Sequence, residues 1–409
     1  MSLPAFRHLL KIVPFQHEDR EVFRVQDQAE TLFDHQVLLP PAAFVVATFL
    51  DGKRDAEQVR QAILQQFPQA QLTVENIQQI VADLDEHLLL DSPRAEGRRR
   101  EIRESWQNAP VRPPRFVSGT KEEVQSEVDG YYGAQAGAGK PGDAKELPLA
   151  GILAPHIDFH RGGTCYTHAY RELAERSQAE VYVVLGVAHM SPPNPFVVTR
   201  KSYETPLGTV PTDPEIVAGL EKRLGSRIFD FEWLHGSEHS AEFQAVFLRH
   251  ARSAAPFTIV PILASAFVQW CGDASPSTAP EIEEFLQALA ESVKGRKVCF
   301  VAGVDFAHVG PVFGDDVQID QKLVEWMMAG DTRSLQTLME GNPESFWNSV
   351  MSDGDRRHVC GTSATYATLR LLGDVDGKVH KYGFAPDPAG GLVSFASMSF
   401  QSRSRIVLP

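Results

Sequence analysis

The stretch VCFVAGVDFAHVG, residues 298–310, decides the fold class of this chain. It begins as a continuous apolar run of strand length, and Asp305 and His308 follow where that run ends. Two similar runs lie upstream: AGILAPH ends in His156 and VYVVLGVAH ends in His189. Continuous apolar runs are typical of strands that are buried on both faces of a parallel sheet. The chain is therefore predicted to have an α/β fold, whose parallel sheet has histidines at the ends of its strands.

Amphipathic segments separate these runs. We expect strands at 149–153, 181–185, 258–263 and 298–304, and helices at 213–224, 239–251, 281–293, 315–328 and 361–372. This alternation predicts a mostly parallel sheet flanked by helices on both faces. The carboxyl ends of parallel strands share one edge, where ligands bind. His156, His189 and His308 can therefore meet there, together with Cys360 at the start of the last predicted helix, where the helix dipole favours a thiolate.

Length and composition narrow the function classes. A chain of 409 residues is expected to form two domains. Its net charge of −14 argues against binding to nucleic acid or to an anionic membrane. No apolar run is long enough to span a bilayer, and the first residues are too polar for a secretory signal. Four widely spaced cysteines without a CxxC pair suit reduced thiols, so we expect a cytoplasmic protein.

The chain is expected to divide near residues 92–112. Residues 1–92 are predicted to form a small, mostly helical domain, with helices at 40–52, after Asp55 and after Thr73. Residues 93–112 contain three consecutive arginines and a proline-rich stretch, which favours an exposed linker. Residues 113–409 would form the α/β domain. The glycines of GAGKPG lack phosphate-loop spacing, so residues 133–148 are interpreted as a surface loop.

The N-terminal domain resembles a winged helix. More closely, FLDGKRDAEQVRQAIL (49–64) and IVADLDEHLLL (80–90) resemble the PqqD-like fold, which implies recognition of a peptide. Residues 1–95 contain 8 Lys or Arg against 14 Asp or Glu, so this domain would repel nucleic-acid phosphates. We therefore expect a peptide or protein partner, and a packing domain without a ligand remains the alternative.

Five motifs follow one another along the second domain: LAPHIDFHRGG, VLGVAHMSPPNP, HGSEHSAEFQAVFL, VAGVDFAHVG and VCGTSA. Together they resemble the MEMO family, including AmmeMemoRadiSam system protein B, over residues 113–402. The resemblance implies a fold like that of the class III extradiol dioxygenases, with one metal ion on His156, His189 and Cys360. It places Asp305, His308 and His239 beside that ion as the catalytic candidates. It also implies a radical SAM protein and an AMMECR1-like protein as partners.

The chain departs from the family pattern at Phe159, Met190 and Gln244, where many members have Tyr or His. A second difference concerns the chemistry of the metal ligands. Extradiol dioxygenases use two histidines and a carboxylate, whereas a thiolate is softer and oxidisable and could suit copper(I) or iron. Ring cleavage is therefore not implied. We expect one iron or copper ion in preference to zinc. We expect a metal-dependent oxidoreductase, and the alternative is a non-catalytic scaffold that binds a peptide or protein.

Each candidate residue also has a purely structural interpretation. The histidines could hydrogen-bond at strand ends, and Cys360 could be a small buried apolar residue. Asp305 could orient a ligand histidine or cap the next turn. His239 and Glu242 could form a pair on a helix surface. His160, His235, His358 and Cys165 are expected to be structural.

Overall fold

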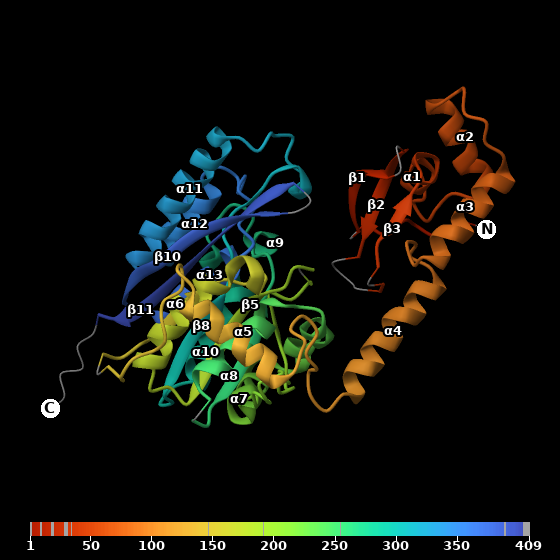
Figure 1. Cartoon of the computed structure of the whole chain (residues 1–409). Coiled ribbons are helices and arrows are strands. Elements are labelled where there is room, and N and C mark those ends of the chain that lie inside the picture. Colours follow the sequence, from red (N-terminus) through yellow and green to blue (C-terminus); the bar gives the residue numbers. More distant parts are fainter. Residues whose placement is uncertain are drawn as a thin grey trace. The chain divides into compact units, whose positions relative to one another are not determined.

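The computed structural model describes residues 2–8, 10–17, 20–27, 32–33, 35–145, 147–190, 192–253, 255–387 and 390–403. The chain forms two compact units, Met1–Ala109 and Pro110–Pro409 (Figure 1). Within the described ranges, no helix is both long enough and apolar enough to cross a lipid bilayer.

The first unit combines a small antiparallel sheet with helices. Its strands pair in the order β1-β2-β3. The helices predicted after Asp55 and Thr73 are confirmed, and both begin with a capping box, in which the cap side chain and the third helical residue hydrogen-bond reciprocally. None of these three strands was predicted from the sequence. The elements are β1 (Lys11–His17), β2 (Arg20–Gln26), β3 (Val37–Leu39), α1 (Pro41–Thr48), α2 (Ala56–Gln66), α3 (Val74–Glu86) and α4 (Pro93–Asn108).

The segment predicted as a linker is mostly a helix. Ser92 caps α4, and Pro93 occupies its first turn, where a missing backbone N–H costs nothing. Ala95 and Trp106 of α4 are buried. Two arginines of this segment hydrogen-bond to nearby carboxylates on the surface: Arg99 donates to Asp91 at 2.7 Å, and Arg103 donates to Glu96 at 2.6 Å. The contact pattern therefore assigns this helix to the first unit.

The second unit has a mixed sheet that is parallel in its centre. Its strand order is β10-β11-β4-β8-β5-β7-β6, and β9 pairs with β11. β4, β8, β5 and β7 run parallel, whereas β6, β9, β10 and β11 join antiparallel. The strands are β4 (Gly151–Ala154), β5 (Val181–Val187), β6 (Phe196–Val198), β7 (Thr258–Ala264), β8 (Val298–Gly303), β9 (His308–Val309), β10 (Val375–Asp387) and β11 (Gly391–Ser402).

Helices cover both faces of this sheet, as the sequence predicted. Successive residues of β5 alternate between two cores: Val183 and Leu185 pack on one face, and Tyr182 and Val184 on the other. α5, α6 and α8 cover the face of Tyr182, while α7, α10, α12 and α13 cover the opposite face. The helices are α5 (Lys121–Gly133), α6 (Phe159–Arg176), α7 (Pro214–Leu224), α8 (Ser240–Ala251), α9 (Val268–Cys271), α10 (Pro280–Ser292), α11 (Gln321–Met339), α12 (Pro343–Met351) and α13 (Thr362–Leu372).

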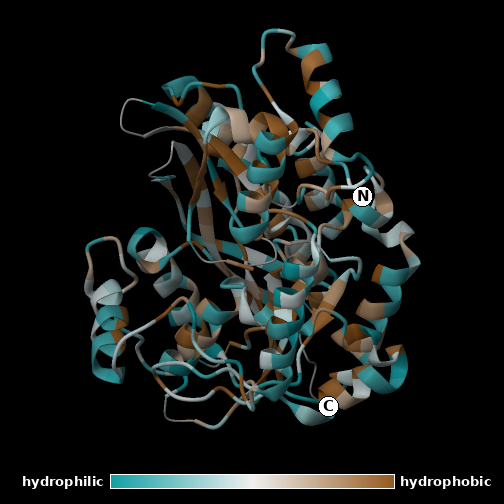
Figure 2. Cartoon of the chain, turned by 90° about the vertical axis from the view of Figure 1, so that its right-hand side faces the viewer, coloured by the Kyte–Doolittle hydropathy of each residue, from teal (hydrophilic) through white to brown (hydrophobic). Residues whose placement is uncertain are grey.

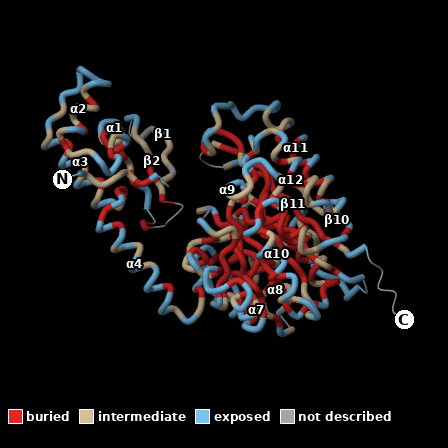
Figure 3. Tube along the Cα trace, turned by 180° about the vertical axis from the view of Figure 1, so that it is seen from behind, coloured by how far each residue is buried: buried red, intermediate tan, exposed pale blue. Residues whose placement is uncertain are grey.

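The pictures agree with this layered arrangement. Figure 2 shows hydrophilic and hydrophobic residues alternating along the helices, as expected of helices with one buried side. Figure 3 shows burial concentrated in the central strands of the second unit and exposure on its outer turns. The fold therefore has continuously buried central strands and amphipathic outer helices.

Two features of the second unit differ from the prediction. The helix expected at 315–328 begins at Gln321 instead, because Asp320 caps it, and it extends to Met339. The long antiparallel pair β10 and β11 was missed. β10 carries charged and small residues with little apolar alternation, so its sequence offers only a weak strand pattern.

Candidate metal centre

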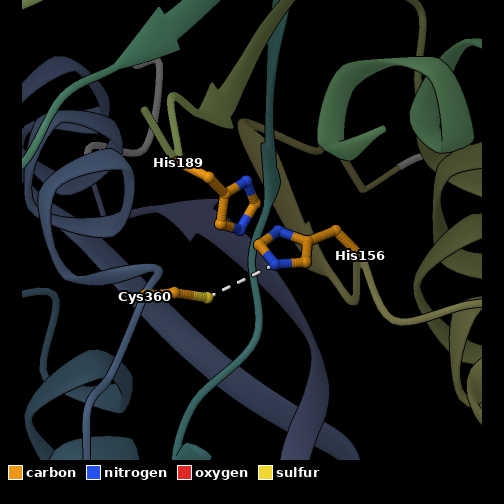
Figure 4. Close-up of side chains that lie close together, drawn as sticks. All are labelled: His156, His189 and Cys360. Carbon is orange, nitrogen blue, oxygen red and sulfur yellow. Dashed lines mark hydrogen bonds between the residues drawn. The ribbon is translucent and has the colours of Figure 1, made fainter. Parts of the chain in front are cut away.

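Three segments far apart in the sequence bring His156, His189 and Cys360 together. His156 follows β4 and His189 follows β5, two parallel strands with β8 between them, so both lie at the same sheet edge. Cys360 comes just before α13. The side-chain ligand atoms of these three residues all lie within 4.8 Å of one another. Figure 4 shows the three side chains pointing toward a common centre, with the Cys360 Sγ 3.3 Å from His156 Nε2.

A glycine lets the cysteine reach this centre. A Cβ atom on Gly361 would lie 2.5 Å from the Val304 Cβ and 2.7 Å from the Asp305 carbonyl oxygen. Such contacts are far too short, so no larger residue fits between Cys360 and the end of β8 without displacing the turn. The Cys-Gly sequence therefore combines a ligand with the close backbone approach that presents it.

His156 is oriented by the backbone of the neighbouring strand. Its Nδ1 lies 3.0 Å from the carbonyl oxygen of Gly303, the last residue of β8. Asp305 does not bond this ring nitrogen; its Oδ1 accepts a hydrogen bond from the backbone N–H of His156 at 3.0 Å. With Nδ1 facing a carbonyl oxygen, the ring carries its proton there. Nε2 lies 3.3 Å from Cys360 Sγ and 3.6 Å from Asp305 Oδ2, and it is the nitrogen available to a metal.

His189 is oriented by a carboxylate that sequence analysis did not single out as a site residue. Glu238 Oε2 lies 2.8 Å from His189 Nδ1, and Glu238 Oε1 accepts from the His189 backbone N–H at 2.7 Å. A carboxylate on Nδ1 fixes the tautomer and increases the basicity of Nε2. Glu238 lies in the motif HGSEH beside the predicted His239, which was the available clue.

Charges within the cluster change the proton affinities of its ligands. Burial lowers the pKa of His189, but Glu238 and Cys360 outweigh it, and the result is well above the usual value. Burial would raise the pKa of Cys360, yet His156 and His189 lower it overall. In the metal-free cluster these shifts favour a Cys360 thiolate beside a His189 imidazolium. The His189 side chain retains 33% exposure, so solvent reaches the candidate site at this residue.

His239 lies against both ligand histidines. Its ring centroid is 5.2 Å from that of His156 and 5.1 Å from that of His189, on which it stacks. Burial, with the neighbouring His189 and His156, lowers the pKa of His239 well below its usual value. The α8 start reaches this point because Gly186 and Gly303 leave room for Ser240. His239 is therefore held in its neutral form beside the candidate ligands.

Asp305 and His308 lie at the end of β8, as predicted. Burial raises the pKa of Asp305 to about 6 even though His308 and backbone N–H groups oppose it. Burial also lowers the pKa of His308, against the attraction of Asp305. The His308 Nδ1 lies 3.1 Å from the Phe306 carbonyl oxygen. Asp305 can therefore exchange a proton near pH 6, whereas burial favours the neutral form of His308.

The interpretation of His239 and Glu242 as a surface pair is wrong, because Glu242 is fully buried. Its Oε1 accepts hydrogen bonds from the backbone N–H groups of residues 115–117 at 3.0, 2.9 and 3.0 Å. Its Oε2 lies 2.5 Å from Arg112, which is also fully buried. Arg112 donates to the carbonyl oxygens of His235 and Glu238. The end of the expected linker is thus held against the segment that carries Glu238 and Glu242, beside the candidate metal centre.

The other predicted structural residues occupy ordinary positions. His235 and Cys165 are buried, while His160 and His358 are exposed. Gln244 stands where many members of the family have histidine, and its side-chain amide forms buried hydrogen bonds. It donates to the Pro155 carbonyl oxygen at 2.7 Å and accepts from the Tyr170 hydroxyl at 2.8 Å.

The chain is similar in sequence to proteins of one family. The sequence model of the family described as Memo-like protein matches residues 118–398. A MEMO1 family protein of Aquifex aeolicus is 27% identical over 369 residues, which cover 88% of this chain and 91% of the relative. One from Methanopyrus kandleri is 27% identical over 305 residues, covering 72% of this chain and 99% of the relative. The alignment with the Aquifex protein therefore includes part of the first unit. Since the family match covers most of the second unit, this chain belongs to the Memo-like protein family.

Proposed function

We propose that the second unit binds one metal ion through Nε2 of His156, Nε2 of His189 and Sγ of Cys360. The observation that carries the proposal is the convergence of these three ligand atoms within 4.8 Å from three separate segments. The donor chemistry fits the ion, because both Nδ1 atoms already face oxygen acceptors and the cysteine pKa is lowered. Two imidazoles and a thiolate suit iron, copper and zinc alike. We propose iron or copper because the oxidoreductase proposed below needs a metal that changes its oxidation state, which zinc does not do.

We further propose that this centre belongs to a metal-dependent oxidoreductase. A bound redox metal would supply electron transfer and would polarise a ligand in an open coordination position. The chain's own residues would handle protons: Asp305, with its pKa raised to about 6, would hold or release one near that pH, and His308 would exchange one with a bound substrate, while His239 would remain a neutral hydrogen-bonding group beside the ion. The exposed edge of His189 offers a small substrate access to the centre.

Metal content of anaerobically purified protein tests this proposal. Wild type is compared with Cys360→Ala and with Cys271→Ala, a matched control because Cys271 is also a half-buried free cysteine. We expect iron or copper near one equivalent in wild type and in Cys271→Ala, and a large loss in Cys360→Ala. Absence of metal from all three proteins after anaerobic reconstitution would refute the metal site. Metal binding without metal-dependent oxygen consumption or substrate oxidation would argue against the oxidoreductase.

A second proposal concerns the first unit, which we suggest binds a peptide or protein partner. Two observations favour it: residues 1–109 form their own compact unit, and acidic residues outnumber basic ones by 14 to 8 in residues 1–95. Basic segments of a radical SAM or AMMECR1-like protein are the partners proposed. Their binding to the full chain, measured by fluorescence anisotropy with and without chelator, separates this role from the metal site. The free cysteines favour a cytoplasmic location.

A further inference from the structure

A buried ion pair lies outside the candidate metal centre and takes no part in the chemistry proposed above. Arg357 is in the segment just before Cys360, and Asp331 is in α11; both are fully buried. The Arg357 Nη1 lies 2.7 Å from Asp331 Oδ1. Replacing such a pair with apolar residues is often neutral or stabilising, so stability alone is a weak reason for its presence.

One arm of this pair reaches the segment that carries Asp305 and His308. The Ser394 hydroxyl donates to Asp331 Oδ2 at 2.6 Å and accepts from the Ala307 backbone N–H at 2.8 Å. The Ser394 carbonyl oxygen also accepts from the Phe306 backbone N–H at 2.8 Å. The Asp331 carboxylate is therefore connected through a single serine to the turn between β8 and β9.

The second partner of the pair, Arg357, belongs to the turn that presents Cys360. The Arg357 carbonyl oxygen accepts from the His308 backbone N–H at 2.7 Å. Asp355 and His358, on either side of Arg357, have φ values of 52° and 50°. Residues other than glycine rarely adopt this left-handed conformation, and the surrounding contacts must hold them in it. The buried guanidinium between these two residues supplies such contacts, including Ser334 Oγ at 3.2 Å.

We propose that the Asp331–Arg357 ion pair is a positioning element that sets the Cys360 turn against the Asp305–His308 turn. It touches neither substrate nor metal. Through directional bonds, it fixes the spacing between the thiol and the groups proposed to move protons. This inference rests on the proposed function only in regarding Cys360 as a ligand; the geometric claim concerns the apoprotein itself.

Two variants disturb the pair without removing either charge. Arg357→Lys keeps the charge but loses the planar fork of donors. Gly330→Ala leaves both partners intact, yet its new Cβ would lie 2.6 Å from Arg357 Cδ and 2.7 Å from Nε, which displaces the guanidinium. Leu289→Ala is the control, because it removes a buried side chain from α10 in the same core and so lowers stability without touching the pair.

Two readouts follow the Cys360 turn. In a Cys271→Ser background, Cys360 is the remaining cysteine that is not buried, since Cys165 and Cys299 are buried. The rate at which iodoacetamide alkylates Cys360 in metal-free protein reports the accessibility and reactivity of its thiol. Cobalt(II) titration, followed by thiolate charge-transfer absorption, reports ligand geometry. We expect both positioning variants to change the alkylation rate several-fold and to weaken cobalt(II) binding about 10-fold or more.

The control decides whether such changes come from position or from lost stability. The proposal is supported when Arg357→Lys and Gly330→Ala change the alkylation rate and Leu289→Ala does not. It is overturned when both variants match the background protein, or when Leu289→Ala produces the same changes. If the background protein binds no cobalt(II), the metal proposal fails separately, and the alkylation comparison still decides the positioning role.

Discussion

The Arg112–Glu242 pair allows a demanding test of the forces that hold the segments around the candidate metal centre. Arg112→Met removes the only counter-charge that the structure places on the fully buried Glu242 among the described residues. The carboxylate keeps its three backbone N–H donors but becomes an unpaired buried charge. Breaking a buried pair in this way costs about 3–5 kcal/mol. That is a large share of the roughly 5–15 kcal/mol that stabilises an ordinary domain.

A double variant separates the unpaired charge from lost packing. In Arg112→Met/Glu242→Gln, an amide oxygen still accepts the backbone N–H groups and no charge remains to be compensated. We therefore expect the double variant to be more stable than Arg112→Met alone. Its loss of stability should be smaller than the sum of the losses in the two single variants by about 1–3 kcal/mol.

Urea unfolding followed by tryptophan fluorescence measures these differences, because Trp233, Trp270, Trp326 and Trp347 all lie in the second unit. Arg227→Met is the control, since its ion pair with Glu284 is more than half exposed and worth little. A loss below about 1 kcal/mol for Arg112→Met, or a double variant that is simply additive, would refute the reasoning.

Three further outcomes are expected. Glu238→Gln weakens metal binding about 10–100-fold, measured by calorimetry, because His189 loses its charged partner; unchanged affinity would contradict this role. Gly361→Ala displaces the Cys360 turn and lowers both metal content and thermal midpoint; a normal content would show that the turn can relax. Burial lowers the pKa of His235 in the folded protein to about 3. Below pH 6.5 the unfolded chain takes up a proton at this residue and the folded protein does not, so the free energy of unfolding is unaffected above pH 6.5 and decreases as the pH falls toward 3. His235→Asn should flatten the pH dependence of the urea midpoint below pH 6.5, and an equally steep profile would exclude His235 as its cause.

Local patterns predicted much of the fold. The run from Val181 to Val187 is buried throughout, as its continuous apolar character indicated. Asp55 and Thr73 cap the helices that were assigned to them, because capping is decided by residues three apart. Missed elements were those with weak local patterns, chiefly the β10–β11 hairpin and the strands of the first unit.

The sequence by itself determined that His156 and His189 follow buried strands and that Cys360 precedes a helix, since strand and helix patterns are local. The tertiary structure alone decided which groups orient them. A Gly303 carbonyl faces one imidazole and Glu238 the other, while Arg112 and Arg357 find their carboxylates across the fold. Each charged residue has several possible partners in the sequence. Only packing brings one of them within hydrogen-bonding distance, and only burial makes leaving it unpaired costly.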